Sequence, residues 1–142
     1  MRYLGLDLGT RTLGLAYSEG VIASSLKTIR YQEEEDLIEK LKEVINELNI
    51  DILVLGLPKN MDNTLGPRAL STLEFKEKLE SFGYKVELQD ERLSTVSAHN
   101  YMIEADLSRR KRKQKVDALA AMIILQTYLE RGNKSERWKN DF

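Results

Sequence analysis

Residues 3–20, YLGLDLGTRTLGLAYSEG, give the clearest indication of the fold. It holds two short apolar runs, residues 3–8 and 12–18, and a third run at residues 21–29 follows the Glu19-Gly20 turn. Strand-like runs joined by short turns of this kind are typical of an antiparallel hairpin or meander. The first three strands are therefore expected to pair antiparallel.

The rest of the chain alternates helices with strands. Residues 50–57, IDILVLGL, are a nearly continuous apolar run of the kind that parallel sheets bury on both faces. Helical spacing and Pro or Gly boundaries place helices at 33–49, 67–83, 93 to about 105, and 116–129, with one more strand at 84–88. Right-handed helical crossovers make the later strands parallel. The prediction is an α/β fold whose mixed five-stranded sheet is flanked by helices.

The length of 142 residues fits one domain, expected at residues 1–131, with a loose polar tail at 132–142. Because the chain has no Cys and one His, it can form neither disulfides nor a zinc-thiolate or multi-histidine site. No apolar run approaches the roughly 18–20 residues of a membrane span. These features predict a cytoplasmic protein without a membrane partner.

Basic residues are concentrated in one segment. The chain has 22 Lys+Arg and 23 Asp+Glu. Without the six basic residues of this segment, 16 Lys+Arg remain against 23 Asp+Glu, which gives a net charge of −7. The six are Arg109, Arg110, Lys111, Arg112, Lys113 and Lys115. Such an asymmetry indicates a polyanionic partner, and the alternative is a solvated basic loop.

Three acids stand in apolar surroundings or at strand ends. Asp7 lies inside the first strand, Glu91 follows the last strand, and Asp117 opens the final apolar helix. Sites in such sheets collect at the carboxyl ends of the strands, and carboxylates in apolar settings are costly unless they are paired, protonated or bound to a cation. The three acids are therefore expected to share one site.

Each acid also has a structural alternative. Asp7 could accept hydrogen bonds from turn amides near Gly9, and Glu91 and Asp117 could be helix-start acids that favour the helix dipole. A shared carboxylate site would bind Mg²⁺ or Mn²⁺, since hard oxygen ligands suit hard divalent ions. Two such ions can activate a water and stabilise the leaving oxygen of a phosphodiester.

Four blocks in this order resemble the YqgF/RuvX family of Holliday junction resolvases, which are also described as pre-16S ribosomal RNA nucleases. They are LGLDLGTRTLG at 4–14, VLGLPKNMDNTLGPR at 54–68, QDERLST at 89–95 and KVDALAA at 115–121. The resemblance implies a ribonuclease H-like fold, with Asp7, Glu91 and Asp117 as catalytic, metal-binding acids. It also implies 5′-end processing of the small-subunit ribosomal RNA precursor, or else cleavage of four-way junction DNA.

The chain departs from the related RuvC-type resolvases at two positions. Those proteins carry an acid after the central strand and a second acid in the last helix, three residues after the first one. Here the strand ends in Gly56-Leu57-Pro58, and the helix position is Ala120. Three obvious acids remain, and Asp62 or Asp90 would be speculative substitutes.

The basic segment precedes the helix that bears Asp117, where it would hold phosphates without reading sequence. Lys59 and Arg68, in the loop after the central strand, could bind the same nucleic acid from the side opposite the basic segment. For Arg92, contact with phosphate and pairing with a carboxylate both stay open. The sequence leaves the oligomeric state open as well.

Two other classes of protein compete with a nuclease. A non-catalytic nucleic-acid-binding module would keep the fold and the charge without turnover. Actin-like ATPases and sugar kinases share the D-x-G-T pattern of residues 7–10. Those proteins clasp a nucleotide between two such domains, whereas this chain has the length of one.

Overall fold

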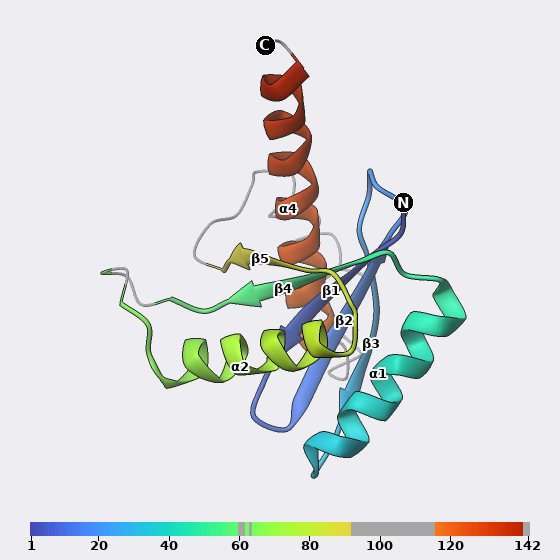
Figure 1. Ribbon diagram of the computed structural model, residues 1–142, viewed down its shortest axis with the longest axis vertical. Coiled ribbons are helices and arrows are strands. Elements are labelled where there is room, and N and C mark those ends of the chain that lie inside the picture. The colour runs from blue at the N-terminus through green and yellow to red at the C-terminus, as the bar shows by residue number, and fades with distance from the viewer. Residues whose placement is uncertain (60–61, 63, 92–115, 141–142) are drawn as a thin grey trace.

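The computed structural model describes residues 1–59, 62, 64–91 and 116–140, with the side chains of 118–131 described in the last range. Seven elements before the final helix alternate much as the sequence predicts (Figure 1). In chain order the elements are β1 (Tyr3–Leu8), β2 (Thr12–Ser18), β3 (Ser24–Arg30), α1 (Glu34–Leu48), β4 (Ile52–Leu57), α2 (Pro67–Ser81), β5 (Val86–Asp90) and α4 (Val116–Asn140).

The five strands form one mixed sheet in the order β3-β2-β1-β4-β5. Strand β2 is antiparallel to both β1 and β3, whereas β4 is parallel to both β1 and β5. The predicted mixed sheet is therefore confirmed. Since β1, β4 and β5 run the same way, their carboxyl ends meet at one edge of the sheet.

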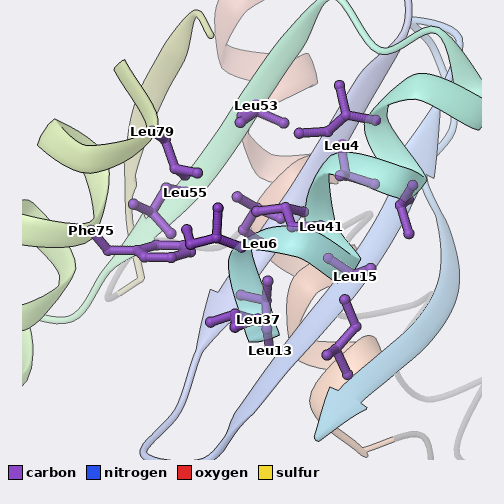
Figure 2. Packing of buried hydrophobic residues seen from close by; sticks show 14 of the residues in the cluster. Leu4, Leu6, Leu13, Leu15, Leu37, Leu41, Leu53, Leu55, Phe75 and Leu79 are labelled. Carbon is purple, nitrogen blue, oxygen red and sulfur yellow. The ribbon is translucent and has the colours of Figure 1, made fainter. Parts of the chain in front are cut away.

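Helices cover both faces of the sheet. On one face, α1 and α2 pack over alternate strand residues, as Figure 2 shows for Leu4 and Leu6 of β1 beside Leu41 of α1 and Phe75 of α2. On the other face, α4 packs over a second apolar cluster that includes Val54 and Leu125. Side chains alternate between the faces of a strand, so Gly5 and Asp7 lie on the α4 face.

Helix α4 approaches the sheet closely at Gly5. A Cβ atom at this position would lie 2.8 Å from both the backbone oxygen of Ala121 and Cβ of Leu125. Glycine therefore lets the helix backbone lie directly against β1. This contact fixes the position of the first turn of α4 along β1, relative to Asp7.

The third strand begins later than the sequence predicts. It starts at Ser24 rather than at residue 21, and Val21 and Ile22 are exposed. The side chain of Gln126 accepts a hydrogen bond from the Ala23 backbone N–H at 2.8 Å and donates one to the Val21 carbonyl at 3.3 Å. This segment therefore bonds to α4 before it joins the sheet.

The last helix continues past its predicted end at Leu129 to Asn140. Gly132 costs only about 1 kcal/mol inside a helix, and the Lys, Glu and Arg residues that follow are good helix formers. The helix predicted at 93–105 lies outside the described residues. Within the described part of the chain, no helix has both the length and the apolar character that crossing a membrane requires.

Candidate functional site

Asp7 lies near the carboxyl end of β1, on the face of the sheet that α4 covers. It is paired in register with Gly14 of β2, while its neighbour Leu6 is paired with Leu55 of β4. The next position of β4, beside Asp7, is Gly56. Both positions flanking Asp7 in the sheet are thus glycines, which leaves room around its carboxylate.

Glu91 follows β5 directly and reaches back over this room. Its backbone N–H donates to the carbonyl of Leu57 at 3.1 Å, which holds the residue at the end of β4. A Cβ atom on Gly56 would lie 3.0 Å from both Cγ and Oε1 of Glu91, so the side chain runs directly over that glycine. The carboxyl groups of Glu91 and Asp7 meet there in a hydrogen bond.

The carboxyl group of Glu91 keeps its proton to a higher pH than an ordinary glutamate. Burial, then the hydrogen bond to Asp7 and the Asp7 charge, raise the pKa of Glu91 from its ordinary 4.5 to about 7. The charge of Arg68 opposes this rise in pKa, and that of Asp90 adds to it. Two partly buried carboxyl groups in hydrogen-bond contact repel each other when both are ionised, and a proton or a metal ion relieves this repulsion.

The third predicted acid, Asp117, lies in the first turn of α4. Ala121, one helical turn later, packs on Gly5, and Asp7 is two residues beyond Gly5 along β1. The helix start therefore lies at the same end of the β1–α4 contact as Asp7. The side chain of Asp117 is outside the described part of the chain, within which no three His, Cys, Asp or Glu side chains group around a common point.

Gly56 is a site residue that sequence reasoning missed. The absence of an acid after the central strand was visible in the sequence, but its reason was not. The signal was a lone glycine among large apolar residues in ILVLGL, the sequence of β4. The space that a side chain at position 56 would fill is occupied by the carboxylate of Glu91, the residue that follows β5.

The suggested substitutes for a fourth acid have different surroundings. Asp90 ends β5 next to Glu91, and its charge acts on that carboxyl group. Asp62 lies in an exposed loop, where its Oδ1 accepts hydrogen bonds from the backbone N–H of Thr64 at 3.1 Å and from Oγ1 of Thr64 at 2.6 Å. These bonds favour a turn-forming role for Asp62.

Among the predicted nucleic-acid contacts, Arg68 lies beside the acids. It stands in the first turn of α2, and its Nη2 donates to the carbonyl of Leu8 at 3.4 Å. The exposed guanidinium is close enough to lower the pKa of Glu91. Lys59 follows the end of β4 and is half-buried. Arg92 and the run Arg109, Arg110, Lys111, Arg112, Lys113 and Lys115 lie outside the described residues.

Replacing Glu91 by Gln is expected to stabilise the metal-free protein at pH 8. Because the folded-state pKa of Glu91 is about 7, above its ordinary 4.5, the stability that its protonated form contributes is complete below pH 4.5 and is lost as the pH rises through 7. Glutamine stays uncharged throughout. The gain, discounted because the carboxyl is partly exposed, is about 1–2 kcal/mol.

Thermal unfolding in EDTA at pH 4.5 and pH 8 measures this effect. The expected rise in Tm at pH 8 is roughly 3–8 °C, with little change at pH 4.5. Glu77→Gln makes the same exchange on the exposed surface of α2 and serves as the control. Equal stabilisation by Glu91→Gln at both pH values would contradict the raised pKa of Glu91.

The chain is similar to one protein family over nearly its whole length. The model of the RuvX family, "Holliday junction resolvase", matches residues 1–131. A protein of Geobacillus sp. (strain WCH70) named "Putative pre-16S rRNA nuclease" is 50% identical over 135 residues, which cover 92% of this chain and 98% of that protein. A protein of Desulfitobacterium hafniense with the same name is 50% identical over 133 residues, covering 92% of each chain.

Solved structures share the fold at much lower identity. RuvC of T. thermophilus in complex with a Holliday junction substrate has a TM-score of 0.57 at 16% identity, covering 93% of this chain and 96% of that one. The yeast mitochondrial Holliday junction resolvase Ydc2 has a TM-score of 0.54 at 10% identity, covering 97% and 81%. These likenesses confirm the expected ribonuclease H-like fold.

Proposed function

Since the chain belongs to the RuvX family of Holliday junction resolvases, we propose that it is a metal-dependent nuclease that processes the 5′ end of the small-subunit ribosomal RNA precursor. The observation that carries the proposal is the contact between the carboxyl groups of Asp7 and Glu91 at the carboxyl edge of the sheet. Two carboxyl groups held in contact offer the hard oxygen ligands that a divalent cation prefers.

The donor set fits Mg²⁺ or Mn²⁺. Asp7 and Glu91 offer hard oxygen atoms, and the charge of Asp7 raises the pKa of Glu91, so a cation bound to both would lower their repulsion. Asp7, Glu91 and Asp117 would hold the metal. When bound, the metal supplies a water of lowered pKa and stabilises the charge on the leaving oxygen of a phosphodiester.

The residues of the chain have separate tasks in this proposal. Glu91 would hold the cation in its deprotonated form, so metal binding should strengthen as the pH rises through about 7. Arg68 stands at the end of β1 with an exposed guanidinium, which suits a phosphate oxygen of the bound strand. Gly56 keeps open the space through which Glu91 reaches Asp7.

Precursor ribosomal RNA is the favoured substrate because the relatives that are 50% identical are named for it. Junction DNA is the second candidate, favoured by the description of the family. A nucleic-acid-binding module without turnover is the alternative from another class.

One experiment separates these functions. The purified protein is incubated with labelled precursor RNA and, separately, with a labelled four-way DNA junction, each with Mn²⁺ or with EDTA. Metal-dependent shortening of the RNA to the mature 5′ end is the expected result. Symmetrical cutting of the junction alone would favour the second candidate, and binding of both without cleavage would establish the binding module.

A further inference from the structure

A second group of cations lies on the described surface, beside the predicted site but separate from every basic residue that the sequence indicated. Arg11, Arg30 and Lys40 line one shallow hollow, and Arg30 and Lys40 also line the next one together with Lys27. All four side chains are exposed. They come from the β1–β2 turn, the edge strand β3 and helix α1, and we call them the edge patch.

Hydrogen bonds to backbone carbonyl groups hold three members of the edge patch close together. Nζ of Lys40 donates to the carbonyl oxygen of Arg30 at 3.5 Å, and the backbone N–H of Tyr31 donates to the carbonyl of Arg11 at 3.0 Å. Like charges so placed repel one another unless an anion lies between them. The arrangement therefore favours an anionic ligand.

The acids near the edge patch do not neutralise it. Asp36 and Glu43 border the two hollows, so four cations face two carboxylates. The ion pairs found among the described residues are Lys76–Glu80 and Lys78–Glu34, and neither includes a member of the patch. Outside residues 109–115 the chain has more acidic than basic residues, so the positive charge of the edge patch is a local excess.

The edge patch connects with Arg68 along the surface. Tyr31 and Gln32 border both the hollow of Arg11 and a cavity of about 460 Å³ that extends to Arg68. Gly14 of β2 is paired with Asp7 of β1 on one side and with Thr28 of β3 on the other. Arg30 lies two residues after Thr28 in β3. Ordinary strand spacings put the backbone of Arg30 about 12 Å from that of Asp7.

We propose that the nucleic-acid strand cut at Asp7 and Glu91 continues past Arg68 to the edge patch, where Arg11, Arg30, Lys40 and Lys27 bind its phosphates. The inference rests on the proposed function, since it takes the acid pair as the place of cleavage. One phosphate cannot span about 12 Å of sheet, so the ligand is a polymer with several phosphates. Contacts of this kind add affinity without reading sequence.

The test is the salt dependence of binding in EDTA, where metal-dependent cleavage is absent. The probe is a fluorescein-labelled RNA carrying the 5′ end of the ribosomal RNA precursor. The triple variant Arg11→Gln, Arg30→Gln, Lys40→Gln is expected to reduce the slope of log K against log salt by about 2, and to weaken binding roughly a hundredfold at 0.1 M salt. The control Lys42→Gln, Lys76→Gln, Lys85→Gln removes the same charge away from the patch.

A slope of the triple variant equal to that of the control would overturn the edge patch. Metal-dependent cleavage by the unmodified protein is measured separately and tests the proposed function. Cleavage by the unmodified protein together with an unchanged slope in the triple variant would reject the edge patch and support the nuclease function. A reduced slope without cleavage by the unmodified protein would support the patch as a binding surface and reject the nuclease.

Discussion

Replacing Asp7 by Asn is expected to lower the rate of metal-dependent cleavage by on the order of a thousandfold, which corresponds to about 4 kcal/mol of lost transition-state stabilisation. Asparagine keeps the size of the side chain but removes the negative charge that a divalent cation needs. Among the described acids, Asp7 alone lies within a strand between two glycine positions and meets Glu91 from there.

The fold is expected to survive Asp7→Asn. The amide can donate a hydrogen bond to the Glu91 carboxylate, so the contact between the two side chains is retained. Nucleic-acid binding in EDTA should also remain, because the basic residues are untouched. Single-turnover cleavage with Mn²⁺, binding in EDTA and thermal unfolding measure the three quantities.

Asp51→Asn is the matched control. It makes the same exchange just before β4, at the opposite end of the sheet, where Oδ2 accepts a hydrogen bond from the backbone N–H of Arg2 at 2.8 Å. Cleavage by this variant should equal that of the unmodified protein. Equal cleavage by Asp7→Asn would reject the acid pair as the place of metal binding.

The sheet and the acid pair could be predicted because both follow from local patterns. The alternation in β1 and the continuous apolar run of β4 fix which strands are buried on one or both faces. Once the later strands are parallel, their carboxyl ends meet, and Asp7 and Glu91 are brought to one edge. The side chain of Asp117 lies outside the described residues, so its role stays a prediction.

Features made by side chains from several elements could not be predicted in this way. The edge patch is assembled from single cations in a turn, a strand and a helix, and each alone resembles an ordinary surface residue. The late start of β3 depends on hydrogen bonds from Gln126, which is about a hundred residues distant in sequence. The role of Gly56 depends on the path of the Glu91 side chain from another strand.

Gly56→Ala is expected to lower cleavage by about ten- to a hundredfold, although the residue itself has no chemistry. The added Cβ would lie 3.0 Å from Cγ and Oε1 of Glu91, so the Glu91 side chain must shift from the position in which it meets Asp7. A displacement of about 1 Å at a reacting centre can cost about a hundredfold in rate. Single-turnover cleavage at saturating Mn²⁺ measures this effect.

The same methyl group also meets Cδ1 of Ile124 on α4, so a loss of stability has to be separated from the loss of cleavage. Overpacking of this kind costs about 1–3 kcal/mol. Ile124→Val removes Cδ1, and in the double variant with Gly56→Ala the total number of carbon atoms is unchanged. The double variant should therefore regain most of the stability that Gly56→Ala loses, as measured by urea unfolding.

Cleavage should not recover in the double variant, because the contact between the new methyl group and Glu91 remains. Ile124→Val alone is the control, with a stability loss of about 0.5–1.5 kcal/mol and ordinary cleavage. If the double variant regained both stability and cleavage, the effect of Gly56→Ala would come from the packing of α4. Recovery of stability alone would mean that Gly56 acts on catalysis through the position of the Glu91 carboxylate.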